Sequence, residues 1–297
     1  MNARSVGLAA VLVWGLSTPM LVQTASAAGT KTAEDFFREG VDHLNAGRHV
    51  ESVQSFQFCV QYKPDQKECW FNLGVAHGRQ RQFAREADAY KKAVRLDPNY
   101  GRAHFNLGVV LEDLGQSDAA LLHYERAVAA DPKAHDARLN RAMVLLSQRR
   151  VDEAIRALRA AIEVKPDNPE AWFDLAGALE IKALKSQSQA RSIGLNRAVE
   201  AYQKALEIEP RHHRATYNIG LVLHRLKDRG GEIAMYRKCL ALRPNYAPAL
   251  YNLAFALRDN KEAKLAREAF AAYLKATADR KRESRFRAIA KREMEKL

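Results

Sequence analysis

Six polar residues recur at a fixed spacing through most of the chain. Successive members lie 34 residues apart, except for one interval of 44, and they are Asn72, Asn106, Asn140, Asp174, Asn218 and Asn252. An asparagine side chain carries a carbonyl acceptor and an amide donor side by side, so it can pair with both groups of a peptide bond. A regular series of such side chains on one surface can hold an extended peptide without reading its sequence. These residues could therefore bind a ligand non-covalently, or they could cap or bridge neighbouring helices.

Residue patterns typical of catalysis are absent from the sequence. It contains no glycine-rich phosphate-binding loop, no Gly-x-Ser-x-Gly turn, no His-Glu-x-x-His and no Cys-x-x-Cys. His212 and His213 form a doublet, but no third ligand follows at a useful spacing. We therefore expect no metal site, no cofactor and no enzymatic activity.

The three cysteines leave two interpretations open. Cys59 lies near the end of one expected helix and Cys69 near the start of the next, so the two can form a disulfide in an oxidising compartment and leave Cys239 free. Cys59 and Cys239 also occupy positions where a small buried residue is sufficient. The spacing alone does not decide between a Cys59–Cys69 disulfide and three free thiols.

Prolines reveal the elements that position the polar residues. Six prolines recur through the chain, and the intervals between them are 34, 34, 34, 44 and 34 residues: Pro64, Pro98, Pro132, Pro166, Pro210 and Pro244. Such a period is typical of a repeat architecture. Each period contains two amphipathic runs with apolar residues three or four apart, which predicts two helices, and the proline ends the second. One helix pair cannot bury its apolar face alone, so stacked pairs must form the core.

Small and large residues recur with the same period. The eighth position of each unit is glycine or alanine: Gly40, Gly74, Gly108, Ala142, Ala176, Gly220 and Ala254. A large apolar residue follows later: Phe56, Tyr90, Tyr124, Leu158, Tyr202, Tyr236 and Phe270. An apolar row precedes the asparagine row by one position: Phe37, Phe71, Phe105, Leu139, Phe173, Tyr217 and Tyr251. We expect this row to pack between helices.

The segment Trp70-Phe71-Asn72-Leu73-Gly74, followed by Tyr90, Ala93 and Pro98, resembles the signature of the tetratricopeptide repeat family. Trp172-Phe173-Asp174-Leu175-Ala176, followed by Tyr202, Ala205 and Pro210, is similar. The resemblance covers seven units, at 33–66, 67–100, 101–134, 135–168, 169–212, 213–246 and 247–278.

The resemblance implies an all-α, right-handed superhelical solenoid in which the first helix of each pair lines a concave groove. The asparagine row would point into that groove, in an array similar to the asparagine ladder of O-linked N-acetylglucosamine transferases. The alternative is that these side chains cap or bridge neighbouring helices. Two glutamates depart from the family pattern, since Glu86 and Glu232 stand where a small residue is typical and suggest looser helix packing.

The fifth unit is ten residues longer than the others, and the excess lies within residues 182–196. This polar stretch either lengthens the helix hairpin or forms a solvated loop.

The first 27 residues have the layout of a secretory signal peptide: Arg4, an apolar run from Val6 to Leu16, and Ala25-Ser26-Ala27. Cleavage after Ala27 would leave a short linker, 28–32, and an exported, periplasmic protein. The alternative is an uncleaved segment that anchors the protein in the inner membrane.

Residues 279–297 are predicted to form a basic amphipathic helix, with Phe286, Ile289, Ala290, Met294 and Leu297 on one stripe. It would cap the last unit, or alternatively contact an anionic membrane surface.

The chain has 48 Lys+Arg against 35 Asp+Glu, a balance that favours anionic partners. Export argues against nucleic acid as one of them. We therefore expect a non-catalytic scaffold of the bacterial envelope that binds a protein or peptide in its groove. The alternative is a peripheral protein that binds membranes or polyanions through the final helix. The sequence makes no prediction about the oligomeric state.

Overall fold

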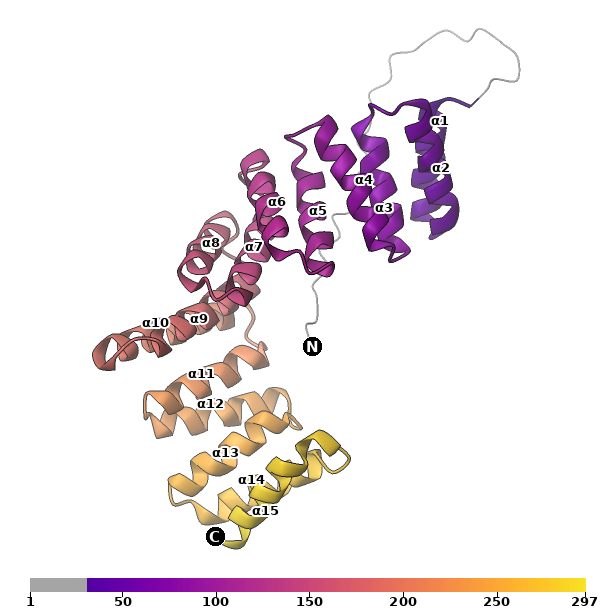
Figure 1. Ribbon diagram of the computed structural model, residues 1–297. Coiled ribbons are helices and arrows are strands. Elements are labelled where there is room, and N and C mark those ends of the chain that lie inside the picture. The colour runs from indigo at the N-terminus through magenta and orange to yellow at the C-terminus, as the bar shows by residue number, and fades with distance from the viewer. Residues whose placement is uncertain (1–30) are drawn as a thin grey trace. The chain divides into compact units, whose positions relative to one another are not determined.

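The structure is a computed structural model that describes residues 31–297. The predicted signal peptide, residues 1–27, and residues 28–30 of the linker lie outside the described residues. Between residues 31 and 297 the regular structure consists of fifteen α-helices and one 3-10 turn, without strands (Figure 1). The predicted all-α class is confirmed.

The helices follow one another in consecutive pairs, and the two helices of a pair contact each other in every pair that lies within one compact unit. In unit order they are α1 (Ala33–Asn45) and α2 (His49–Tyr62), α3 (Lys67–Arg79) and α4 (Phe83–Leu96), α5 (Gly101–Asp113) and α6 (Ser117–Ala130), α7 (His135–Ser147) and α8 (Val151–Val164), α9 (Pro169–Leu184) and α10 (Ser188–Ile208), α11 (His213–Arg225) and α12 (Arg229–Leu242), and α13 (Ala247–Asp259) and α14 (Ala263–Ala276). The turn η1 (Lys281–Glu283) and α15 (Ser284–Glu295) end the chain.

The described residues divide into two compact units, residues 31–144 and residues 145–297, with the boundary inside α7. In the compact unit that ends at residue 144, α2 contacts α3 and α4 contacts α5, so each of these hairpins packs on the next. In the second unit, α8 contacts α9, α10 contacts α11 and α12 contacts α13. Within each unit the fold is the predicted solenoid of stacked helix pairs.

A glycine of the first helix lies against an aromatic ring of the second in four of the hairpins: Gly40 with Phe56, Gly74 with Tyr90, Gly108 with Tyr124, and Gly220 with Tyr236. A Cβ atom at Gly108 would lie 2.6 Å from the Tyr124 ring, which has no exposed surface. The periodic glycines therefore allow the two helices of a hairpin to approach each other closely.

The turn inside each of six hairpins contains a residue with positive φ. Glycine fills this position in two turns, Gly47 and Gly115, with φ of 72° and 74°. In the others an arginine or lysine adopts φ between 59° and 64°: Arg81, Arg149, Lys227 and Lys261. The shared backbone conformation explains why these turns have the same length despite different residues.

The ten additional residues of the fifth unit lengthen the helix hairpin and do not form a loop. Helix α9 has 16 residues and α10 has 21, whereas α11 has 13 and α12 has 14. The extended part packs tightly, since a Cβ atom at Gly194 would lie 2.7 Å from the Cβ atom of Ala183. Leu195 is buried beside them.

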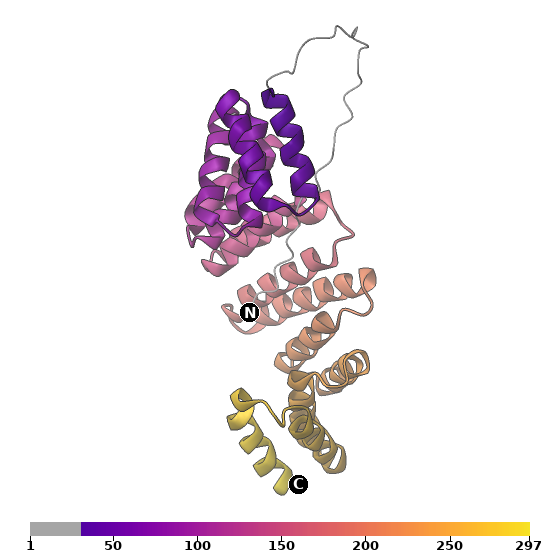
Figure 2. The same ribbon diagram turned by 90° about the vertical axis from the view of Figure 1, so that its right-hand side faces the viewer.

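Helix α15 packs on the last hairpin, and it ends the second unit (Figure 2). Ala290 is completely buried, and Met294 and Leu297 pack against the same core cluster as Phe270 and Tyr273. Phe286, by contrast, keeps 47% of its surface exposed. None of the helices between residues 31 and 297 is both long and apolar enough to cross a membrane.

The glycine–aromatic packing predicts opposite effects for two glycine substitutions. Gly108→Ala places a methyl group into the Tyr124 ring and should lower the free energy of unfolding by about 1–3 kcal/mol. Gly177→Ala in α9 meets only the Tyr202 hydroxyl, at 3.7 Å, and should raise it by up to about 1 kcal/mol through helix propensity. Urea denaturation followed by circular dichroism measures both. Equal effects of the two substitutions would contradict this packing.

Candidate functional site

The predicted polar row lies on the first helix of each hairpin, on α3, α5, α7, α9, α11 and α13, and every member is partly buried. The apolar row beside it packs against the large side chain of the same hairpin. Ring centroids lie 5.6 Å apart for Phe71 and Tyr90 and 5.4 Å apart for Phe173 and Tyr202. The expectation that this apolar row belongs to the core is confirmed.

Three of the asparagines donate an amide N–H to the hydroxyl of a buried tyrosine in the preceding hairpin. The distances from Nδ2 to the hydroxyl oxygen are 3.3 Å for Asn106 to Tyr90, 3.5 Å for Asn140 to Tyr124 and 3.1 Å for Asn218 to Tyr202. Each pair lies within one of the two units. The row thus bridges neighbouring hairpins, as one of the two interpretations of the sequence requires.

Each of these tyrosine hydroxyls donates in turn to a carboxylate. Tyr124 donates to Glu112, and Tyr202 donates to Glu180 over 3.4 Å. Tyr90 is bonded to Glu86, whose charge adds to burial in raising the pKa of the Tyr90 hydroxyl. An asparagine, a tyrosine and a glutamate therefore form a hydrogen-bonded chain from the surface into the hairpin core, and we call this arrangement an Asn–Tyr–Glu relay.

The relay leaves half of each asparagine side chain unused. Among the described residues, the carbonyl oxygens of Asn106, Asn140 and Asn218 accept no hydrogen bond. Each amide also keeps a second N–H. Because the tyrosine fixes the amide plane through one N–H, the remaining donor and acceptor are held in a defined orientation. The arrangement can therefore both bridge hairpins and present a donor–acceptor pair to a ligand.

Three members of the row lack this relay. Asn72 donates to the Glu68 backbone carbonyl of its own helix, at 2.9 Å, and the residue sixteen positions before it is phenylalanine. Asn252 donates to the Tyr217 hydroxyl, at 2.9 Å, and it is also hydrogen-bonded to the Tyr236 hydroxyl, so here two tyrosines share one amide. Asp174 has no tyrosine partner, because position 158 holds leucine.

The sequence contains a signal for this difference. Asparagine follows tyrosine by sixteen positions at 90 and 106, 124 and 140, 202 and 218, and 236 and 252. Where the earlier residue is Leu158, the later one is aspartate. The coupling of the two positions indicates a contact.

Asp174 lies in a charged group of the second unit. Burial, together with the nearby Glu170 carboxylate, raises the pKa of Asp174 to about 7. His212 approaches Glu170 to 3.4 Å and Arg214 approaches it to 3.9 Å, and the bond to His212 lowers the pKa of Glu170. This part of the row differs in charge from the neutral amides.

The fold agrees with the comparisons with known proteins. Two family models, both described as tetratricopeptide repeat, match the chain, one at residues 37–101, 87–135, 105–163, 139–191 and 186–247, the other at 235–268. The chain belongs to the tetratricopeptide repeat family.

Solved structures of tetratricopeptide repeat proteins share the fold. The crystal structure of YrrB, described as a TPR protein with an unusual peptide-binding site, is 21% identical, covers 67% of this chain and 97% of its own, and has a TM-score of 0.57. The C-terminal part of a TPR protein from Cytophaga hutchinsonii is 15% identical to this chain and has a TM-score of 0.69. The match covers 83% of this chain and 97% of the Cytophaga structure. MamA from Desulfovibrio magneticus RS-1 is 20% identical to this chain and has a TM-score of 0.53. The match covers 61% of this chain and 96% of the MamA structure. No curated protein matches the sequence significantly.

The two glutamates that depart from the tetratricopeptide repeat pattern do not mark loose packing. The Glu86 carboxylate occupies the space that a side chain at Gly78 would take, since a Cβ atom there would lie 2.6 Å from Glu86 Oε1. Glu232 is 3% exposed, and its two oxygens lie 2.8 Å from Arg229 and 3.0 Å from His224. Both positions are closely packed, so the suggestion of looser helices was wrong.

Cys59 and Cys69 form a disulfide between the first two hairpins of this tetratricopeptide repeat protein, with their Cα atoms 5.9 Å apart. Cys239 is buried and free. Whether the pair is oxidised in the cell stays a prediction. His212 and His213 belong to no group of three or more metal-ligating side chains within residues 31–297.

The position of Glu86 predicts a specific dependence of stability on pH. Burial raises its pKa to about 7 in the folded protein from an ordinary value of 4.5. The folded state therefore binds a proton that the unfolded chain has already released, and stability falls as the pH rises from about 4.5 through about 7. Glu86→Gln should leave the melting temperature nearly unchanged at about pH 4.5 and raise it by a few degrees at about pH 8.

Thermal unfolding of wild type and Glu86→Gln across this pH range measures the difference. The exposed Glu163→Gln is the control, and it should parallel wild type throughout. A Glu86→Gln curve that also parallels wild type would contradict the assignment.

Proposed function

We propose that this tetratricopeptide repeat protein is a non-catalytic scaffold of the bacterial cell envelope. It binds an extended segment of a partner protein along the faces that carry the asparagine row. The observation that supports this most strongly is the Asn–Tyr–Glu relay, which fixes each amide through one N–H and leaves its carbonyl oxygen and second N–H unpaired. Preorganised groups of this kind reduce the entropy lost on binding.

Backbone recognition follows from the chemistry of the row. An amide that accepts from a peptide N–H and donates to a peptide carbonyl contacts groups that every residue shares. The partner segment is therefore selected mainly by being extended and accessible. The ionised carboxylate of Asp174 accepts hydrogen bonds and cannot donate them. This position therefore favours an N–H group or a basic side chain of the partner.

Location in the envelope is supported by the first 27 residues, whose composition and order match a signal peptide. The Cys59–Cys69 pair is consistent with an oxidising compartment such as the periplasm.

The alternative, a protein that acts on membranes through residues 279–297, would need the apolar stripe of α15. Ala290 is completely buried, and Met294 and Leu297 pack against the core of the last hairpin. Because the stripe is used within the fold, we favour the scaffold function and the capping role of α15.

Replacing Asn72, Asn106 and Asn140 by alanine should remove most partner binding and leave the fold intact. Each of the three side chains makes one neutral hydrogen bond, so each substitution should cost only about 1 kcal/mol of stability. Residues 28–297 serve as bait for native envelope and cytoplasmic extracts, and mass spectrometry identifies what is retained. We expect a protein retained from envelope extract by wild type and lost from the variant.

The matched control replaces three exposed amides of α2 by alanine, Gln54, Gln57 and Gln61, and should retain the partner. Equal retention by the asparagine variant and wild type would contradict recognition by the row. A large drop in its melting temperature would show that the row is mainly structural. A partner recovered only from cytoplasmic extract would contradict the envelope location.

A further inference from the structure

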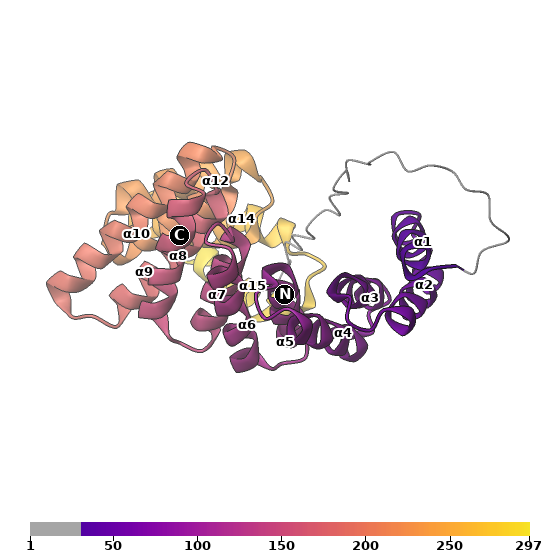
Figure 3. The same cartoon turned by 90° about the horizontal axis from the view of Figure 1, so that it is seen from above.

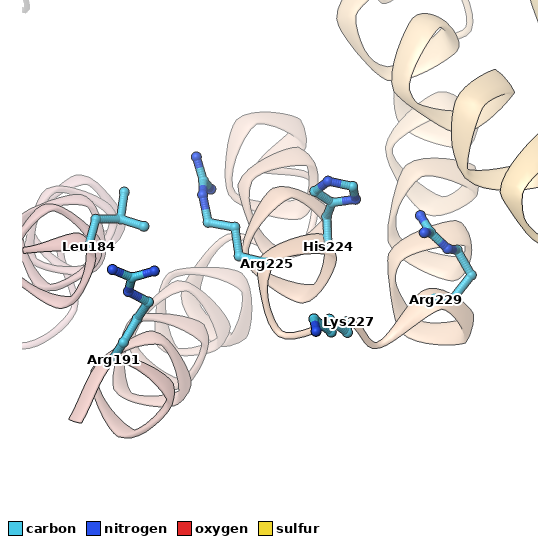
Figure 4. Close-up of a pocket in the computed structure, with 6 residues that line it drawn as sticks. All are labelled: Leu184, Arg191, His224, Arg225, Lys227 and Arg229. Carbon is cyan, nitrogen blue, oxygen red and sulfur yellow. The ribbon is translucent and has the colours of Figure 1, made fainter. Parts of the chain in front are cut away.

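A second surface feature lies within residues 145–297, where the turn of the α9–α10 hairpin lies near the turn of the α11–α12 hairpin. A cavity of about 580 Å³ opens there, and the figure shows basic side chains arranged around it (Figure 4). We call it the basic pocket, and its lining residues are Leu184, Arg191, His224, Arg225, Lys227 and Arg229.

The ten-residue insertion builds one wall of the basic pocket. Leu184 ends α9 and Arg191 lies near the start of α10, so both belong to the lengthened part of this hairpin. That hairpin extends beyond the neighbouring α11–α12 hairpin (Figure 3). The tight contact between Gly194 and Ala183 holds the extended helices together, so the wall is a packed element. A hairpin of ordinary length would not reach this far.

The α11–α12 turn forms the other wall and carries most of the charge. Arg225 is neutralised by Glu180, at 2.7 Å, and Arg229 by Glu232, at 2.8 Å. These carboxylates hold the two guanidinium groups in place at the edge of the cavity.

Two basic residues of the pocket have no acidic partner. Within residues 31–297, neither Arg191 nor Lys227 lies within ion-pair distance of a carboxylate. Arg191 donates Nε to the Ser186 backbone carbonyl, at 3.1 Å, which orients its guanidinium group and leaves both terminal nitrogens unpaired. The pocket therefore carries uncompensated positive charge that an anionic ligand would stabilise.

We propose that the basic pocket binds an acidic peptide segment. Carboxylates of the segment contact Arg191 and Lys227, and an apolar side chain lies against Leu184, which is 40% exposed. The two unpaired charges come from two hairpins, Arg191 from α10 and Lys227 from the turn after α11, which favours a chain with several carboxylates over a single phosphate. Arginine pairs with carboxylates through two parallel hydrogen bonds, which gives this contact direction as well as charge. The proposal does not depend on the asparagine row.

The test uses a short synthetic peptide of Glu, Asp and Leu, labelled with an uncharged fluorophore, and its Gln, Asn and Leu counterpart. Fluorescence anisotropy with full-length mature protein measures binding at low and at physiological salt. Wild type should bind the acidic peptide but not its amide counterpart, and added salt should weaken binding. Arg191→Glu combined with Lys227→Glu should weaken it by about tenfold or more.

The control exchanges the same charges elsewhere in the second unit, with Lys238→Glu and Arg267→Glu on exposed positions of α12 and α14. It should change affinity by less than about twofold. If the double glutamate variant melts at a lower temperature than wild type, Arg191→Gln with Lys227→Gln replaces it and should still weaken binding. The Asn72, Asn106 and Asn140 variant should bind the acidic peptide like wild type, which separates this site from the proposed groove.

Three results would overturn the proposal. The first is equal loss of affinity in the pocket and control variants, which would indicate only the general charge of the protein. The second is no binding of the acidic peptide by wild type. The third is displacement of the peptide by inorganic phosphate at comparable concentration, which would identify an oxyanion site without preference for a peptide.

Discussion

The contact between a small residue of the first helix and a large residue of the second sets the geometry of the hairpins. Where the small residue is glycine, the ring of the partner lies so close that a single added methyl group would overlap it, as at Gly108 and Tyr124. In the hairpins with alanine, Ala176 shares a core cluster with Tyr202, and Ala254 shares one with Phe270. This close approach lets each helix pair present a continuous apolar side to the next pair, and the solenoid follows from it.

Using tyrosine as the large residue brings a hydroxyl group into the core, and the rest of the candidate site follows from satisfying it. A buried hydroxyl without partners would destabilise the fold. Here the hydroxyl donates to a glutamate and accepts from an asparagine of the next hairpin, as at Tyr202 with Glu180 and Asn218. Core packing and the orientation of a surface amide are thus coupled in one hydrogen-bonded chain. At Asp174 this chain is absent, since Leu158 brings no hydroxyl.

The periodic features of the fold were predictable because they repeat. Prolines, small residues and large residues at one spacing predict the helix pairs, and the position of the asparagines predicts which helix carries them. The features that depend on a single contact were not predictable from periodicity. Glu86 fits because Gly78 lies opposite, and Glu293 is buried in the stripe of α15 because Arg258 pairs with it at 2.8 Å. The conformation of the insertion was left open because residues 182–196 contain no repeat partner, and its helices are fixed by the contact of Gly194 with Ala183.

In the function proposed here, buried tyrosine hydroxyls orient the asparagine amides for a ligand. The most direct measurement is a thermodynamic cycle on affinity for the captured partner, with Tyr90→Phe and Tyr124→Phe on one side and Asn106→Ala and Asn140→Ala on the other. Phenylalanine keeps the ring packing and removes only the hydroxyl. We expect the tyrosine substitutions to weaken binding although neither hydroxyl contacts the partner. The two pairs of substitutions together should reduce the binding free energy by much less than the sum of their separate effects. Unchanged binding by the phenylalanine variant, or fully additive effects, would contradict it.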